Sequence, residues 1–143
     1  MTLAERHRQL VEDLSLIPDR QERLGVIVDR TRKLAPLPAT DRITENRVAG
    51  CQSTVWLIAQ RNTDGTLALR CDAESPMVKG LVYLLVEAYN GATPTEIAAT
   101  EPDFIDKLEL LRDLSPTRQN GLLAVRARIR QLAQTALIGQ PGH

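Results

Sequence analysis

The spacing of hydrophobic residues predicts two amphipathic helices within the first 35 positions, because apolar side chains recur there every three to four residues. The two stripes are Leu3, His7, Leu10 and Leu14, then Leu24, Ile27, Thr31 and Leu34. Each helix begins with a pair at capping-box spacing, Thr2 with Glu5 and Asp19 with Glu22. We interpret His7 as a packing residue rather than a ligand. The prolines in residues 35–38 end the helical pattern.

The central part of the chain predicts a β-hairpin. Residues 55–60 form an apolar run, and residues 66–71 alternate, with Cys71 on the apolar side. Between them, residues 62–65 (NTDG) have turn chemistry, since glycine tolerates positive φ and Asn and Asp hydrogen-bond locally. Residues 46–48 are expected to add a third strand.

The remainder of the chain is predicted to be helical. Three helices are expected to start at the pairs Ser75-Pro76, Thr93-Pro94 and Ser115-Pro116, because proline is favoured at the first helical position. A further helix is expected at residues 103–112. These elements predict a single α+β domain over residues 1–143, in which a small antiparallel sheet packs with several helices, and residues 139–143 form a frayed tail.

Composition narrows the function. The 143 residues contain 18 Lys and Arg against 18 Asp and Glu, so the formal charge is zero. A nucleic-acid binder usually carries a basic face, so we expect no nucleic-acid partner. The sequence has no run of about 18 apolar residues, and the polar start does not resemble a signal peptide. We therefore expect a cytoplasmic protein with no membrane partner.

The cysteines and histidines exclude several kinds of site. Cys51 and Cys71 are separated by 19 residues, so the close cysteine pairs of a thioredoxin-type or four-ligand zinc site are missing. A disulfide between them would need an irregular register, because a turn centred on residues 63 and 64 pairs positions that sum to about 127. His7 and His143 lie near the termini and offer no evident base for a cysteine hydrolase.

Cys51 is the candidate for chemistry. It follows Gly50 on a predicted loop that leads directly into the hairpin, and loops often display reactive groups. The neighbouring apolar residues expected to wall the thiol are Val48, Val55 and Trp56. The alternative is that Cys51 packs as a small hydrophobe, as free cysteines commonly do and as we expect of Cys71.

A thiol without a base, metal or resolving partner can still exchange sulfur. Sulfur exchange needs only partial ionisation of the attacking thiol and access to a sulfur electrophile. A nearby cation increases the thiolate fraction. Arg118, in the first turn of the last predicted helix, is the candidate cation, and Lys79 is the second; the alternative for each is a solvated surface charge.

Three blocks of the sequence resemble one family. Residues 50–56 (GCQSTVW) resemble the G-C-Q-S-x-V-W signature of the SufE family, which includes its close relative CsdE. Residues 72–81 (DAESPMVKGL) and 114–122 (LSPTRQNGL) resemble the family's D-S-D-x-x-x-V-K/R-G-L and L-[ST]-P-[ST]-R-x-x-G-L segments. Glu74 stands where the family pattern has Asp, which is a departure.

The resemblance implies a sulfur acceptor of iron–sulfur cluster assembly, with a fold similar to those of SufE and IscU. Cys51 would take persulfide sulfur from a cysteine desulfurase of the SufS or CsdA type and pass it to a scaffold such as a SufBCD-like complex. Pyridoxal phosphate belongs to that partner, so no cofactor and no metal are expected here beyond a transient persulfide on Cys51. The chain would activate the desulfurase rather than act as a stand-alone enzyme. Arg118 matches the family's arginine.

The sequence-based hypothesis is that Cys51 is sheltered at rest and swings outward about Gly50 when the desulfurase docks. Gln52, Ser53 and Arg118 are expected to stabilise the anionic sulfur. Two rivals remain open: a non-catalytic interaction module with structural cysteines, and a metal or cluster carrier. The sequence also leaves open a monomer or a weak homodimer.

Overall fold

The computed structural model describes residues 1–138 as a small hairpin covered by helices. The elements, in chain order, are α1 (Leu3–Ser15), α2 (Arg20–Asp29), the 3-10 turn η1 (Thr44–Asn46), β1 (Val55–Arg61), β2 (Leu67–Ala73), α3 (Pro76–Tyr89), α4 (Pro94–Ala99), α5 (Phe104–Lys107) and α6 (Pro116–Ile138). The α+β prediction is confirmed. The predicted tail at 139–143 lies outside the described residues.

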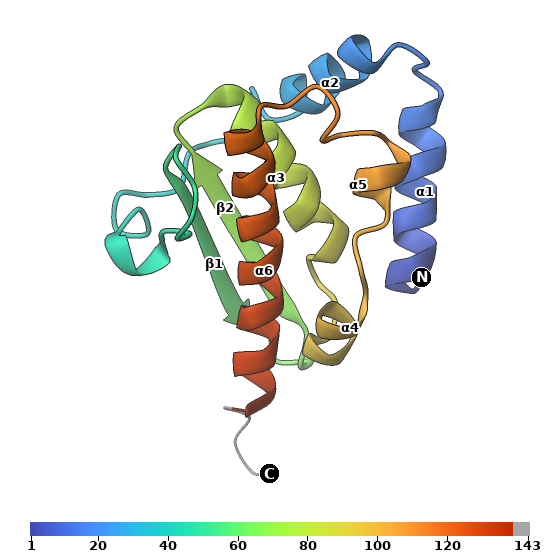
Figure 1. Ribbon diagram of the computed structural model, residues 1–143. Helices are drawn as coiled ribbons and strands as arrows, with labels where there is room; N and C mark the ends of the chain where they lie inside the picture. The colour runs from blue at the N-terminus through green and yellow to red at the C-terminus, as the bar shows by residue number, and fades with distance from the viewer. Residues whose placement is uncertain (139–143) are drawn as a thin grey trace.

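Helix α3 forms the centre of the core. It packs against β2, α1, α2 and α6 (Figure 1). A helix in this position must be apolar over most of its surface, and α3 buries eight of its residues: Gly80, Leu81, Val82, Leu84, Leu85, Val86, Ala88 and Tyr89. Helix α6 runs alongside both α3 and β1. The N-terminal turns of α3 and α6 lie close to the loop that enters β1.

The sheet is smaller than predicted. β1 and β2 pair antiparallel from Val55 opposite Ala73 to Arg61 opposite Leu67, close to the predicted register. The predicted third strand at residues 46–48 is wrong: only an isolated bridge joins Arg47 to Trp56, where the Val48 amide donates to the Val55 carbonyl at 2.9 Å. The turn η1 includes Asn46, the first residue of this segment, so the chain is extended for too few residues to form a strand.

The segment between α2 and the hairpin is fastened to the sheet by a buried carboxylate. Asp72, only 5% exposed, accepts a hydrogen bond from the Leu37 amide at 3.0 Å. Its other oxygen accepts from the Ala73 amide and lies 3.4 Å from the Lys79 ammonium. A buried charge is tolerated when it is paired and hydrogen-bonded. Lys79 is thus committed to this pair.

The helix starts follow their predicted caps. The Thr2 hydroxyl accepts from the Glu5 amide while the Glu5 carboxylate accepts from the Thr2 amide, which confirms that capping box. Asp19, Ser75 and Thr93 each accept a hydrogen bond from an amide in the first turn of the helix that follows. The Glu22 side chain does not bind the Asp19 amide, so only half of that predicted capping box is formed. The helix predicted at 103–112 is shorter, because α5 ends at Lys107 and Glu109 adopts a left-handed φ of 54°.

His7 is a packing residue, as predicted. It is 5% exposed and meets the rings of Tyr89 and Phe104 edge-on, at centroid distances of 5.1 and 4.9 Å. Its Nε2 lies 3.1 Å from the Ala88 carbonyl oxygen. Burial lowers the pKa of His7, so the neutral ring is favoured in this core.

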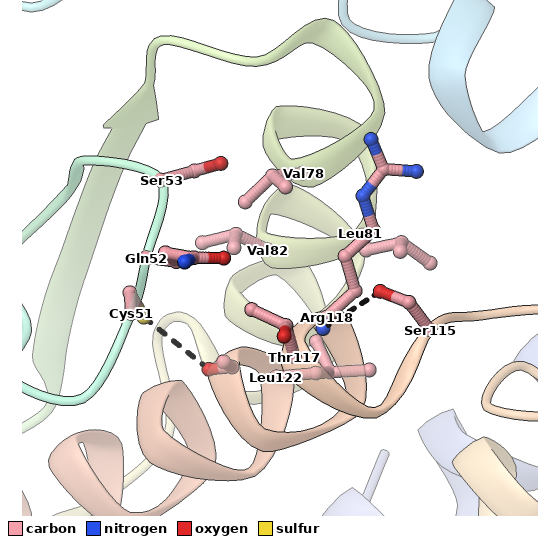
Figure 2. A pocket seen from close by; sticks show the side chains of 11 residues that line it. Cys51, Gln52, Ser53, Val78, Leu81, Val82, Ser115, Thr117, Arg118 and Leu122 are labelled. Carbon is pink, nitrogen blue, oxygen red and sulfur yellow. Dashed lines mark hydrogen bonds between the residues drawn. The ribbon is translucent and has the colours of Figure 1, made fainter.

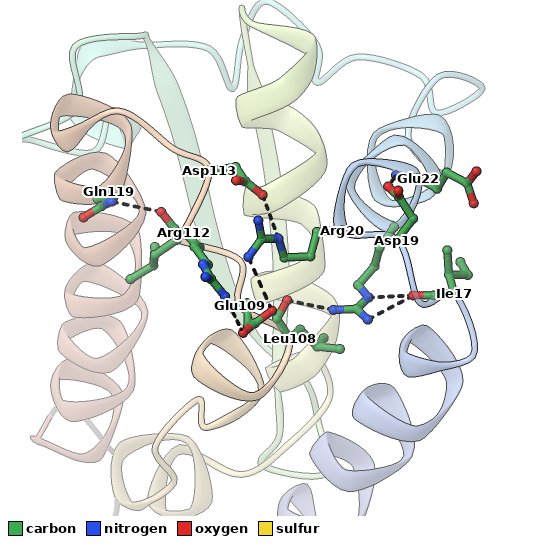
Figure 3. A network of polar contacts seen from close by, with 11 residues as sticks. Ile17, Asp19, Arg20, Glu22, Leu108, Glu109, Arg112, Asp113 and Gln119 are labelled. Atoms are coloured by element: carbon green, nitrogen blue, oxygen red, sulfur yellow. Dashed lines mark hydrogen bonds and ion pairs between the residues drawn. The ribbon is translucent and has the colours of Figure 1, made fainter.

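A buried arginine joins three segments of the chain. Arg23 is 8% exposed and donates to the carbonyls of Leu14, Ile17 and Leu108, at distances between 2.9 and 3.2 Å. Figure 3 shows the Ile17 and Leu108 carbonyls in this network. Arg23 therefore satisfies acceptors near the end of α1 and just after α5, which a hydrophobic side chain could not do.

Candidate functional site

Cys51 lies on the loop of residues 49–54, here called the cysteine loop. This loop joins the Arg47 segment, which is bridged to Trp56, to the start of β1. Gly50 precedes it with φ of 88°, a conformation that disfavours any residue with a Cβ. A Cβ on Gly50 would also stand 3.4 Å from the Ala124 Cβ of α6. The glycine therefore turns the chain sharply and lets the loop approach α6.

The thiol opens on a pocket of about 260 Å³ between the cysteine loop, α3 and α6 (Figure 2). Its lining residues are Cys51, Gln52, Ser53, Val78, Leu81, Val82, Ser115, Thr117, Arg118, Gly121 and Leu122. The structure therefore brings together four of the predicted site residues, Cys51, Gln52, Ser53 and Arg118. The α3 wall is apolar, whereas the loop and the first turn of α6 supply hydroxyl, amide and guanidinium groups.

The predicted apolar wall requires correction. Val48, Val55 and Trp56 are buried, at 6%, 1% and 9% exposure, but they do not line this pocket. The Trp56 ring instead faces the Arg42 guanidinium, which lies 6.0 Å from the ring centroid. Val55 and Trp56 follow β1 into the core, and Val48 is hydrogen-bonded to Val55 at the base of the loop, so the pocket walls come from helices that are distant in sequence.

The walls coincide with two blocks already noted in the sequence. Val78 and Leu81 belong to the block at residues 72–81, while Ser115, Thr117 and Gly121 belong to the block at 114–122. None of these five residues was predicted to line a site, and Ser115 was noted only as the start of a helix. The available signal was that both blocks lie at the predicted starts of helices. The structure brings these two helix starts together at Cys51.

Gly121 is the point at which α6 touches the thiol. The Cys51 Sγ donates a hydrogen bond to the Gly121 carbonyl oxygen at 3.4 Å, drawn as a dashed line in Figure 2. A Cβ at position 121 would lie 3.7 Å from this sulfur and 4.0 Å from the Cys51 Cα. A methyl group fits at those distances, but a longer side chain in that direction would meet the loop.

Burial keeps the resting thiol protonated. Cys51 is half-buried, and desolvation raises its pKa above the ordinary value. Charges do not contribute to this shift, so Arg118 does not lower the thiol pKa in the resting structure. The guanidinium of Arg118 instead donates to the Met77 Sδ at 3.1 Å and points away from Cys51 (Figure 2).

The raised pKa predicts that the Cys51 thiol is alkylated slowly. At pH 8, iodoacetamide should modify Cys51 more slowly in the folded protein than in the protein unfolded by guanidinium chloride. Deprotonation is required for attack, so the folded-state rate should keep rising as the pH passes the free-thiol pKa of about 8.5. Peptide mapping by mass spectrometry measures both rates. Equal rates in the two states at pH 8 would contradict the burial of this thiol.

Cys71 provides the internal comparison for that experiment. It is a free thiol on β2, and burial is the main cause that raises its pKa to about 12. It lines a different cavity, together with Lys79 and Tyr83. We therefore expect Cys71 to be alkylated more slowly than Cys51 at every pH below about 10.

The site contains no group of metal ligands within the part of the chain that the structure describes. Among residues 1–138, no three His, Cys, Asp or Glu side chains lie close enough together to hold a metal ion.

None of the helices described combines the length and hydrophobicity that crossing a bilayer requires.

The fold and the site define a class: a small α+β protein that presents one thiol in a pocket between two helices. Over residues 8–133 the sequence matches the family described as "SufE: Fe-S metabolism associated domain". The chain belongs to the SufE family, which is associated with iron–sulfur metabolism. The resemblance noted in the sequence is thereby confirmed.

The relatives cover nearly the whole chain. An uncharacterised SufE-like protein of Synechocystis sp. is 34% identical over 139 residues, which is 97% of this chain and 87% of that protein. A second uncharacterised SufE-like protein, from Rhizobium etli, is 31% identical over 130 residues and covers 88% of each chain. The solution structure of a hypothetical protein from Thermus thermophilus superposes with a TM-score of 0.75 at 25% identity, covering 94% of this chain and 97% of that one.

Proposed function

We propose that the protein is a sulfur carrier that accepts persulfide sulfur from a cysteine desulfurase on Cys51. The observation that carries the proposal is the Cys51 thiol, which is half-buried on a loop and opens on the pocket between α3 and α6, in a protein of an iron–sulfur family. Cys71, with its pKa raised to about 12, is a poor alternative acceptor. The sulfur would then pass to a cluster-assembly scaffold.

The transfer is a thiol exchange that needs no external oxidant. The Cys51 sulfur attacks the outer sulfur of the donor persulfide, a new S–S bond forms on Cys51, and the donor's S–S bond breaks. The donor leaves as a thiolate and takes up the proton that Cys51 released. The persulfide on Cys51 is the product, and pyridoxal phosphate remains with the desulfurase.

Docking must expose a thiol that the resting structure protects. The cysteine loop would swing outward about Gly50, since its only hydrogen bond to α6 among the described residues is the Cys51–Gly121 contact. Leaving the pocket removes the desolvation that raises the thiol pKa, so the thiolate becomes accessible where the donor sulfur lies. Gln52 and Ser53 travel with the thiol on the same loop and supply donors to the anionic sulfur.

The direct test is to mix the protein with a pyridoxal-phosphate-dependent cysteine desulfurase and cysteine. Intact-mass spectrometry should detect a gain of about 32 Da, one sulfur atom, that a reductant removes. Peptide mapping should place it on Cys51, and desulfurase turnover should rise when the protein is present. A chain that gains no mass with competent desulfurases would refute the proposal.

Arg118 has a role only if its side chain turns toward the sulfur during transfer. Its contact with the Met77 thioether is weak, since thioether sulfur is a poor acceptor, so the guanidinium can move at little cost. Replacing Arg118 by Ala should slow sulfur transfer about tenfold, the loss of one hydrogen bond to a charged group. The affinity for the desulfurase should change less than about threefold.

Arg112→Ala is the matched control, because Arg112 is exposed and pairs with Glu109 outside the pocket. Single-turnover mass measurements give the transfer rate, and titration calorimetry gives the affinity. If both variants transfer sulfur at the wild-type rate, Arg118 has only a structural role.

A further inference from the structure

The carbonyl of Gly121 has an unusual position for a helical backbone group. In α6 it accepts the amide four residues ahead, as in any α-helix, and a carbonyl oxygen has a second lone pair. The Cys51 thiol donates to the same oxygen from the cysteine loop, at a sulfur–oxygen distance of 3.4 Å. A Cβ at position 121 would lie in van der Waals contact with Sγ, at 3.7 Å, so only a side chain longer than a methyl group would disturb this approach.

This contact depends on the hydrogen that the thiol carries. A persulfide replaces that hydrogen by a sulfur atom bonded at about 2.05 Å. If the new bond kept the direction of the S–H bond, the outer sulfur would stand about 1.4 Å from the Gly121 oxygen, given the 3.4 Å between Sγ and that oxygen. No two unbonded atoms come so close. An anionic outer sulfur would in addition be repelled by the carbonyl dipole.

We infer that the Gly121 carbonyl is a positioning group that holds Cys51 only while its Sγ bears a hydrogen and no transferred sulfur atom. This inference rests on the proposed function. Loading replaces the hydrogen that the thiol donates to the Gly121 carbonyl. The outer sulfur cannot take the place of that hydrogen, because the Gly121 oxygen is too close. Rotation about the Cβ–Sγ bond must therefore turn the outer sulfur into the pocket, where Gln52 and Ser53 of the same loop offer hydrogen-bond donors. The pocket volume of about 260 Å³ accommodates it, since a water molecule takes about 30 Å³ of liquid.

The consequence is a difference between the two forms of the protein. The unloaded protein has its cysteine loop tied to α6 by the Cys51–Gly121 hydrogen bond, and the loaded protein does not. Apart from that bond, no other hydrogen bond between the loop and α6 is found among the described residues. Loading with sulfur thus frees the loop, so the form that must deliver sulfur to the next protein is the one whose loop moves more easily.

The test reads the carbonyl itself. The ¹³C chemical shift of the Gly121 carbonyl would be compared in four proteins: the wild-type thiol, Cys51→Ser, Cys51→Ala, and the wild type loaded with one sulfur by inorganic polysulfide. Serine keeps a donor and alanine does not. The thiol and C51S proteins should share a downfield shift, whereas the C51A and loaded proteins should both move upfield.

Backbone order parameters give a second reading. We expect values of about 0.85 for residues 50–54 in the thiol and C51S proteins, and a fall toward about 0.6 in the C51A and loaded proteins. Residues 62–65, in the hairpin turn, serve as the control and should not change. Peptide mapping confirms that the added sulfur, about 32 Da, is on Cys51.

The outcomes decide the inference independently of the proposed function. If the Gly121 shift is the same in C51A and the thiol form, the hydrogen bond does not exist in solution and the inference fails. If C51S groups with C51A, or if the loaded form keeps the shift of the thiol, the carbonyl does not distinguish the two states. Because polysulfide loads the thiol without a desulfurase, a failure of enzymatic loading would refute the proposed function and leave this result standing.

Discussion

Replacing Cys51 by Ser should abolish sulfur uptake completely while leaving the fold intact. The serine oxygen cannot form a persulfide, and its hydroxyl is not ionised near neutral pH. The substitution removes one half-buried sulfur atom and keeps a donor for the Gly121 carbonyl, so the stability should change by less than about 1 kcal/mol. The measurement is intact mass after incubation with desulfurase and cysteine, which should show no gain of about 32 Da.

Cys71→Ser is the matched control for this experiment. Cys71 is the only other cysteine of the chain, and its thiol has a pKa raised to about 12. The C71S protein should take up one sulfur at the wild-type rate. If C51S still accepts sulfur, or if C71S loses the ability, the acceptor has been assigned to the wrong residue. If neither substitution has an effect, sulfur does not travel through a cysteine of this chain.

The C51S variant also separates the rival functions. An interaction module with structural cysteines would keep its full effect on the desulfurase after this substitution, because its surface is unchanged. A sulfur carrier would still bind the enzyme but lose the stimulation of turnover that depends on removing sulfur. Turnover measured at saturating C51S therefore distinguishes a carrier from a docking partner.

Replacing Arg23 by Met should produce the largest loss of stability of any polar substitution proposed for this chain. Methionine retains an unbranched apolar stem, but it leaves the carbonyls of Ile17 and Leu108 without the donor that they share, while the Leu14 carbonyl keeps the Ile17 amide at 3.1 Å. A buried acceptor without a partner costs about 1–3 kcal/mol, and water can reach some of these oxygens. We expect the free energy of unfolding to fall by about 3 kcal/mol.

Arg32→Met provides the control, because the Arg32 side chain is 73% exposed and its one ion pair within residues 1–138 is with Asp29, three residues earlier. Its loss should change stability by less than about 0.5 kcal/mol, as is usual for surface ion pairs. Urea denaturation followed by circular dichroism measures both variants, and an unchanged m-value shows that the unfolded states are comparable. A loss below about 1 kcal/mol for R23M would mean that the Ile17 and Leu108 carbonyls find other partners.

The elements predicted well are those set by local chemistry. The caps at Thr2, Asp19, Ser75 and Thr93 depend on side chains within one turn of the amides that they bind. The hairpin depends on four turn residues and on alternation in β2. Because such interactions span only a few residues, the sequence of each segment contains all the information needed.

The elements predicted poorly depend on distant partners. Arg23 is polar and next to the expected stripe of α2, and only its acceptors on other segments explain its burial. The helix expected at 103–112 has the right spacing, but it ends early at the left-handed Glu109. Nothing in the local pattern signals that turn.

In the candidate site, too, some residues could be predicted from the local sequence, and others depend on contacts with distant residues. Cys51 and Gly50 were identified from adjacent residues, and Arg118 from its place in a helix. The role of Gly121 could not be predicted, because its contact with Cys51 joins residues 70 positions apart. Sequence-based reasoning placed the pocket walls on Val48, Val55 and Trp56, the nearest apolar residues, whereas α3 and α6 provide them.

The fixed ends of the cysteine loop limit how far the thiol can travel. The backbone hydrogen bond from Val48 to Val55 closes the loop at its base, and the Glu74 amide also holds the Thr54 carbonyl at 3.1 Å. Cys51 is three residues from Val48, and three fully extended residues span at most about 11 Å. A donor enzyme must therefore bring its own sulfur to within that short radius of the strand end, either on a mobile arm or by seating this protein deep against its active-site entrance.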